Sequence, residues 1–129
     1  MEAGIEHLKR GTLEHADTLL IVVEPYFKSL EAAGRIAELG RGLGVPALVA
    51  VANKVQSERD EAAIRAYCAA HDLPILAVVP LDADVAEAER QGLAVLDSAP
   101  AAAAVAAIRQ VADRLMAAER PAPTARVAD

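Results

Sequence analysis

Three short runs of apolar residues, none of which alternates with polar residues, constrain the fold of this sequence most. They cover residues 18–23, 47–52 and 75–79. A strand that is apolar on both faces must be buried on both faces, which is typical of a parallel sheet covered by helices. The intervening segments, 29–43 and 57–71, carry apolar residues at the helical period and are long enough for right-handed crossovers. The sequence therefore predicts an α/β fold with about three parallel strands and flanking helices.

Capping and helix-ending residues bound the two crossover helices. Ser29 and Ser57 each stand where a side-chain oxygen accepts a hydrogen bond at a helix start. Gly42 and Gly44 offer the first helix a left-handed end. The second helix is expected to bury one face, made of Ala63, Ile64, Tyr67, Cys68 and His71.

The remainder of the chain is expected to be helical. Asp82 or Asp84 is placed to cap a short helix that ends near Gly92. Pro100 suits the first turn of an Ala-rich helix that runs to Glu119. The apolar stripe of that helix comprises Val105, Ile108, Val111, Ala112, Leu115 and Met116. Residues 120–129 are expected to form a disordered tail, which leaves residues 1–119 as the folded unit.

Composition and charge exclude several classes of function. The 129 residues suffice for one small domain or part of a larger one. A net charge of −6 argues against a nucleic-acid partner, which needs clustered Lys and Arg. The longest apolar run is too short to span a membrane, and no secretory leader is expected because Glu2 and Glu6 stand where one carries positive charge. A single cysteine, which cannot form an internal disulfide, fits a reducing, cytoplasmic setting.

Polar residues follow the second and third apolar runs, at the edge of a parallel sheet where α/β folds bind ligands. The side chain of Asn53 has a donor and an acceptor, as the N6 and N7 edge of adenine requires. Lys54 is expected to shield a base with its alkyl stem. Pro80, Leu81 and Asp82 end the next strand on the same edge and are expected to line the same pocket. Asn53 as a turn residue, and Asp82 as a simple helix cap, remain alternative interpretations.

Several segments, in this order, resemble MinD/ParA-type deviant Walker ATPases, and especially the branch that inserts nickel into carbon monoxide dehydrogenase. The segments are residues 1–8, 10–12, 22–25 with Ser29, 51–55 and 79–82, followed by Val85, Ala88 and Gly92. The resemblance runs to about Leu115 and covers the C-terminal half of such a protein. It implies a three-layer, P-loop NTPase-like half domain that supplies the adenine side of an ATP or ADP site. Gly4 would then lie in the second switch segment, near the γ-phosphate; a frayed N-terminus is the alternative interpretation.

This chain also departs from the family pattern. The phosphate loop with its lysines and the magnesium-side aspartate are absent, and Leu93 and Ala94 stand where a proline is usual. The resemblance therefore implies a missing N-terminal half as a partner, and magnesium only in a full-length protein. No meaningful ATP hydrolysis is expected from this chain alone. A metalloenzyme client is a further partner that the resemblance implies.

The residues that carry metal or acid–base chemistry are few. Cys68 and His71 share a helical face, but a zinc site needs three or four ligands. His7 and His15 add no second pair, so no metal site is predicted within one chain, although a site shared across a dimer stays open. Glu24 is a lone carboxylate that we expect to be solvated, and no residue is predicted to be catalytic.

Two other hypotheses remain beside the ATPase fragment. The run from Leu19 to Val23 would be an uncovered apolar edge, which is an aggregation hazard unless something pairs with it. The chain is then a non-enzymatic module that pairs through this edge, with itself or with a separate N-terminal half. A receiver-like signalling domain is a weaker hypothesis, because no predicted strand ends in a phosphate-accepting aspartate.

Overall fold

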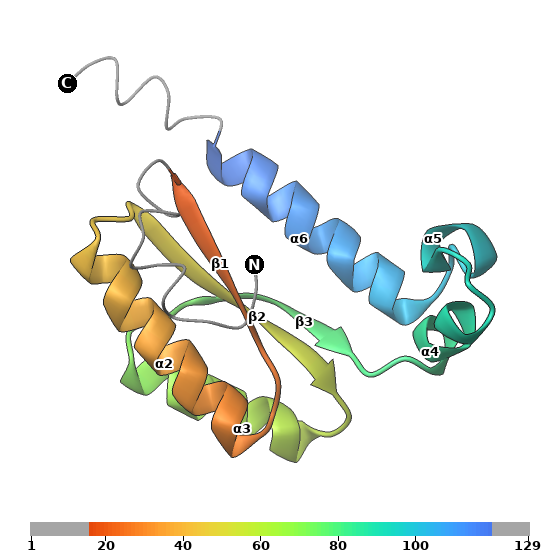
Figure 1. Ribbon diagram of the computed structural model, residues 1–129, viewed down its shortest axis with the longest axis horizontal. Helices are drawn as coiled ribbons and strands as arrows, with labels where there is room; N and C mark the ends of the chain where they lie inside the picture. Colours follow the sequence, from red (N-terminus) through yellow and green to blue (C-terminus); the bar gives the residue numbers. More distant parts are fainter. Residues whose placement is uncertain (1–15, 120–129) are drawn as a thin grey trace.

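The computed structural model describes residues 16–119 and shows three parallel strands in the order β1-β2-β3 (Figure 1). The strands are β1 (Thr18–Val23), β2 (Ala47–Val55) and β3 (Ile75–Pro80). The helices are α2 (Phe27–Gly42), α3 (Glu58–Ala70), α4 (Ala83–Arg90), α5 (Val95–Ser98) and α6 (Ala103–Glu119). The predicted α/β class and the three parallel strands are confirmed.

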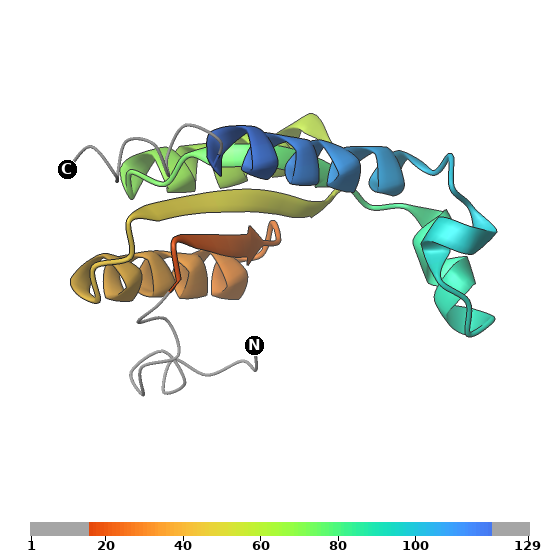
Figure 2. The ribbon, with the colours of Figure 1, turned by 90° about the horizontal axis from the view of Figure 1, so that it is seen from above.

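Helices cover both faces of the sheet, so the fold has three layers. Helices α2 and α3 lie on one side of the sheet and α6 on the other (Figure 1). The core on the first side includes Leu19, Ile21, Val23, Ile64 and Cys68. The core on the second side includes Val51, Ala77, Val79, Ala104, Ala107 and Val111. Helices α4 and α5 lie beyond the ends to which the strands point (Figure 2).

Strand β1 is covered on one face only by the residues that the structure describes. Leu19, Ile21 and Val23 point toward α2 and are buried, as the alternation of side chains along a strand requires. Leu20 and Val22 point the other way and are 36% and 56% exposed. Helix α6 packs against β3 and the centre of the sheet, so it leaves this part of the second face open.

The predicted helix starts are right for α3 and wrong for α2. Ser57 is the N-cap of α3, and its Oγ accepts a hydrogen bond from the N–H of Asp60 at 3.2 Å. Helix α2 instead begins at Phe27, two residues before Ser29. The Oγ of Ser29 accepts a hydrogen bond from the N–H of Glu24 at 2.9 Å. This serine therefore joins the first turn of α2 to the end of β1 rather than capping the helix.

The predicted start of α6 and part of its apolar stripe are also wrong. The helix begins at Ala103, so Pro100 lies in the preceding turn. Small residues make the close contact with the sheet, and Ala104, Ala107 and Val111 are buried. Ile108 and Met116, which the stripe included, are 54% and 63% exposed. The helical period was right, but the face that packs is rotated toward the alanines.

Gly44 and Gly92 follow the ends of α2 and α4 as the sequence predicts, whereas Gly42 is the last residue of α2 and is not left-handed. Gly44, with φ of +80°, and Gly92, with φ of +70°, both have left-handed backbones that glycine adopts without strain.

On α3, Ile64 and Cys68 are buried, whereas Ala63 is exposed, contrary to the prediction. None of the helices in residues 16–119 is both long and apolar enough to cross a membrane.

Candidate functional site

A groove of about 410 Å³ lies at the carboxyl ends of β2 and β3. Its floor comes from the ends of these two strands, and its walls come from α4 and the first turns of α6. The lining residues are Asn53, Lys54, Val79, Pro80, Leu81, Asp82, Val85, Ala86, Glu89, Ala104 and Ile108. All five described residues that the sequence suggested for a binding site therefore meet in one groove. The sixth, Gly4, lies outside the described residues.

A β-bulge at the end of β2 directs the side chains around the groove. Ala52 pairs with Val78 and Val55 pairs with Pro80, so three steps along β2 match two along β3. Ala52 and Val55 consequently both pack into the core beside α3, which strict alternation would not allow. The extra residue keeps Lys54 out of that core. A bulge of this kind re-aims side chains and is frequent beside binding sites.

Lys54 has an unusual backbone and a charged partner. Its φ of +57° is left-handed, which costs a residue with a Cβ roughly 1–2 kcal/mol. Its Nζ lies 3.6 Å from Oε1 of Glu24, at the end of β1. The expectation that Glu24 is a lone, solvated carboxylate was therefore wrong. The bulge brings the two residues together, and sequence spacing does not reveal it.

The side chain of Asn53 is available for a ligand. The residue is half-buried in the groove, and its amide makes no hydrogen bond to any other residue among 16–119. A primary amide has two N–H donors and one carbonyl acceptor. In this groove the amide therefore presents both kinds of hydrogen-bonding group, side by side, to whatever enters.

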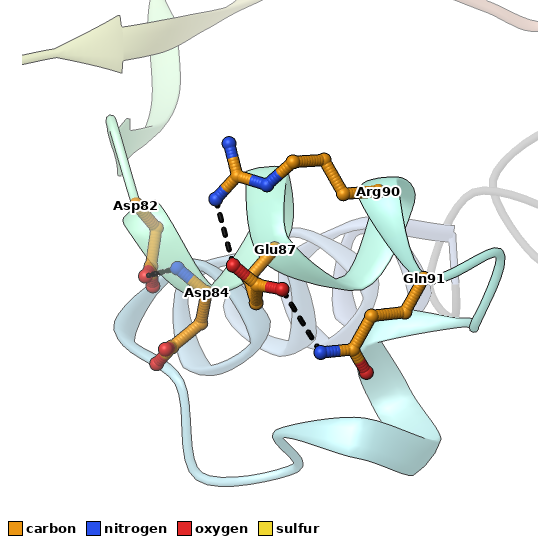
Figure 3. Close-up of polar contacts among 5 residues, drawn as sticks. All are labelled: Asp82, Asp84, Glu87, Arg90 and Gln91. Carbon is orange, nitrogen blue, oxygen red and sulfur yellow. Dashed lines mark hydrogen bonds and ion pairs between the residues drawn. The ribbon is translucent and has the colours of Figure 1, made fainter.

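Asp82 joins the two helices that wall the groove. Its Oδ1 accepts a hydrogen bond from the N–H of Asp84 at 2.9 Å, which caps α4 (Figure 3). Its Oδ2 accepts one from the N–H of Ala104 at 2.9 Å, at the start of α6. The bond from Ala104, and then that from Asp84, lowers the pKa of Asp82 below its ordinary value. The helix-cap interpretation is thus observed, and both carboxylate oxygens are already engaged by backbone.

Apart from Glu89, apolar residues form the rest of the groove lining. Leu81, Val85 and Ile108 all line it and all remain exposed to solvent. The sequence did not single out Ile108 or Glu89 for this site, because they reach it only once α6 and α4 pack beside the strand ends. A groove with mostly apolar walls, and with the amide of Asn53 unengaged by any residue among 16–119, suits a flat, weakly polar ring with hydrogen-bonding edges.

The polar cluster on the outer face of α4 is separate from the groove. Glu87 accepts hydrogen bonds from Arg90 at 2.7 Å and from Gln91 at 2.9 Å (Figure 3). These bonds, that from Arg90 first, lower the pKa of Glu87. Glu87 does not line the groove, so the cluster supports the helix rather than the site.

Cys68 and His71 each make other contacts in the structure. Cys68 is buried in the core, and burial raises the pKa of its thiol. The Nδ1 atom of His71 lies 2.9 Å from the carbonyl oxygen of Tyr67. The rings of the two residues stack with their centroids 4.2 Å apart. Across residues 16–119, no three His, Cys, Asp or Glu side chains gather to hold a metal ion. His7 and His15 lie outside this range.

A second cavity, of about 520 Å³, lies at the opposite end of the sheet. It is lined by the end of α3 and the residues that lead into β3, among them Arg65, Asp72 and Pro74. Although larger than the groove, it is open and shallow, and it lies away from the carboxyl ends of the strands. Ligands of α/β proteins bind at those carboxyl ends, so we assign the site to the groove.

Comparison with known proteins shows what this chain is similar to. No family model matches the chain. It is 41% identical over 126 residues to the carbon monoxide dehydrogenase accessory protein CooC of Rhodospirillum rubrum, covering 96% of this chain and 45% of that protein. It is 40% identical over 92 residues to the uncharacterized ATP-binding protein MJ0823 of Methanocaldococcus jannaschii, covering 71% of this chain and 36% of that protein.

Solved structures show the same fold. The MinD cell division protein of Aquifex aeolicus superposes with a TM-score of 0.72 at 22% identity, covering 90% of this chain and 49% of that one. This chain therefore spans about half the length, or less, of the proteins it matches. The half-domain architecture that the sequence predicts is in accord with that coverage.

Proposed function

Because this chain is a relative of the MinD/ParA-type ATPases, close to CooC, we propose that its groove is the adenine side of a nucleotide site. The observation that carries the proposal is the free amide of Asn53 on the floor of an apolar groove at the carboxyl ends of the strands. Relatives described as ATP-binding support the nature of the ligand.

Five of the lining residues have a role in this proposal. The amide of Asn53 donates to N7 and accepts from the N6 amine of adenine. The alkyl stem of Lys54 covers one face of the ring, while Pro80 and Leu81 cover its edge. Asp82 acts through the fold, since its carboxylate holds α4 and α6 in place as walls of the groove.

The phosphate chemistry belongs to other residues in this proposal. Among residues 16–119, no three His, Cys, Asp or Glu side chains gather into a site for magnesium or nickel. Gly4, in the segment that the resemblance assigns to the second switch, is proposed to approach the γ-phosphate. Since transition-state stabilisation of phosphoryl transfer depends on phosphate-binding groups, we propose that this chain alone does not hydrolyse ATP.

The cellular role is proposed from the relationship to CooC, whose name describes an accessory protein of carbon monoxide dehydrogenase. A nucleotide-dependent maturation factor for a metallocentre, with nickel as cargo and a metalloenzyme as client, fits that relationship. A second part of the same ATPase would then supply the phosphate loop.

Calorimetric titration of ADP and adenosine into the purified chain tests the proposal. We expect weak binding by both ligands, with similar affinity, because the described groove contacts the nucleoside rather than the phosphates. Asn53→Ala should abolish this binding. Gln56→Ala removes an exposed amide that follows β2 but does not line the groove, so it should bind normally. A folded wild-type chain that binds neither ligand would overturn the proposal.

A second candidate function rests on β1. Leu20 and Val22 leave an apolar strip on one face of β1, which is an edge strand of the sheet formed by residues 16–119. Edge strands and exposed apolar strips are normally paired or covered. This observation favours a module that associates through β1, with itself or with a separate N-terminal half. Light scattering that shows a stable monomer at high concentration would exclude self-association.

A further inference from the structure

Glu24 stands next to the proposed adenine site without lining it. Its carboxylate lies 3.6 Å from the ammonium of Lys54, and its backbone N–H donates to Ser29 Oγ at 2.9 Å. The second bond fixes Glu24 between the end of β1 and the first turn of α2. The carboxylate therefore projects from a defined point of the backbone toward Lys54.

The alkyl stem of Lys54 needs such a restraint to form one wall of the groove. Its left-handed backbone is a strained conformation, and strain at a binding site persists only when the surroundings determine it. Its side chain is 51% exposed, so packing alone does not fix the four-carbon stem. Among residues 16–119, Glu24 is the group that the structure pairs with its ammonium.

We propose that Glu24 is a positioning residue for the nucleotide site, which holds the stem of Lys54 along the groove by pairing with its ammonium. This inference rests on the proposed function. It also implies that the charge of Lys54 is already partnered, so that the groove presents this lysine to a ligand as an apolar surface. Removing the carboxylate of Glu24 should then weaken the binding of a nucleoside that Glu24 itself does not touch.

Glu24→Gln tests the inference because simple electrostatics predicts the opposite result for an anionic ligand. Loss of one negative charge near ADP should strengthen its binding, whereas loss of the restraint on Lys54 should weaken it. We expect about two- to fivefold weaker binding of both ADP and adenosine, the size appropriate to an exposed ion pair. The difference between wild type and variant should shrink as salt is added.

Two variants make the test specific. Glu31→Gln removes the same charge from an ion pair with Arg35 on α2 and should leave adenosine binding unchanged. In a Lys54→Met background, which keeps an unbranched stem without the ammonium, Glu24→Gln should have no further effect. Circular dichroism of each variant establishes that the fold is intact.

The outcomes separate the two proposals. If wild type binds and Glu24→Gln binds adenosine as tightly as Glu31→Gln, the positioning role is overturned while the proposed function stands. The positioning role is also overturned if Glu24→Gln weakens adenosine binding equally in the wild-type and Lys54→Met backgrounds. If the folded wild-type chain binds no nucleoside, the proposed function fails, and this inference fails with it.

Discussion

Asp82 and Ala104, 22 residues apart, meet in a hydrogen bond of 2.9 Å that joins the start of α4 to the start of α6. The other oxygen of the same carboxylate caps α4. One side chain therefore satisfies backbone donors of two helices, and both helices form walls of the proposed nucleotide groove. This bond adds to the packing of α6 on the sheet in holding the two walls of the groove together.

Asp82→Ala is expected to destabilise the protein beyond the loss of an ordinary cap. Two backbone donors lose their acceptor, and we expect the thermal midpoint to fall by about 4–8 °C. Asp84→Ala removes a neighbouring carboxylate that makes neither bond and should have a smaller effect. Thermal unfolding followed by circular dichroism provides the comparison, and equal shifts for the two variants would contradict the double-cap role.

The pH dependence of stability should report the same carboxylate. Hydrogen bonds from Ala104 first, and then from Asp84, hold the pKa of Asp82 below its ordinary value of 3.8. A carboxyl whose pKa is lower in the folded state stabilises the fold above its unfolded pKa, and this contribution disappears as pH falls through the folded pKa.

The comparison of wild type with Asp82→Asn isolates this effect, because other carboxyls titrate in both proteins. The difference in thermal midpoint should be largest near about pH 6–7 and should shrink between about pH 4 and pH 2. A difference that stays constant over this range would show that the charge of Asp82 contributes nothing.

Lys54 should show a conflict between stability and binding. Its φ of +57° suits glycine, so Lys54→Gly is expected to be about 0.5–1 kcal/mol more stable than Lys54→Ala, which keeps the strained Cβ. Both variants lose the stem that lines the groove and should bind adenosine more weakly than wild type. Denaturant unfolding measures the stability of the two variants, and calorimetry measures their binding of adenosine. If Lys54→Gly is less stable than Lys54→Ala, the backbone of Lys54 is not strained.

The open face of β1 should control self-association. Val22→Lys places a charge on the exposed face and should lower the average mass in light scattering if the chain associates there. Phe27→Lys changes another exposed apolar residue, at the start of α2, and should leave the mass unchanged. If both variants lower the mass equally, association is a general effect of exposed apolar surface.

Much of the fold follows from local pattern. The run of residues 18–23 is β1 at its predicted bounds, and the cap at Ser57 is where its chemistry placed it. The prediction that Ser29 caps α2 was wrong because a serine hydroxyl can also accept a hydrogen bond from outside the helix. In the structure, its Oγ accepts from the N–H of Glu24 at the end of β1. The packed face of α6 was predicted wrongly because the helical period defines an apolar stripe but not which side of that stripe contacts the sheet.

The position of the candidate site was predicted in part from the parallel order of the strands. Parallel strands bring their carboxyl ends to one edge, so Asn53 and Pro80 had to lie near each other. Ile108 and Glu89 could not be foreseen, because they depend on how two later helices pack. The pairing of Glu24 with Lys54 depends on a bulge, which the apolar pattern of β2 does not reveal.

The sequence by itself determined which segments become strands and helices, because burial on one or two faces imposes a period on the residues. It also determined the edge of the sheet at which polar residues gather. Only the tertiary structure decided that Asp82 joins two helices, that Lys54 turns out of the core toward Glu24, and that β1 keeps an open face. These features arise from contacts between residues far apart in the chain, and their free energies exist only once the elements have packed.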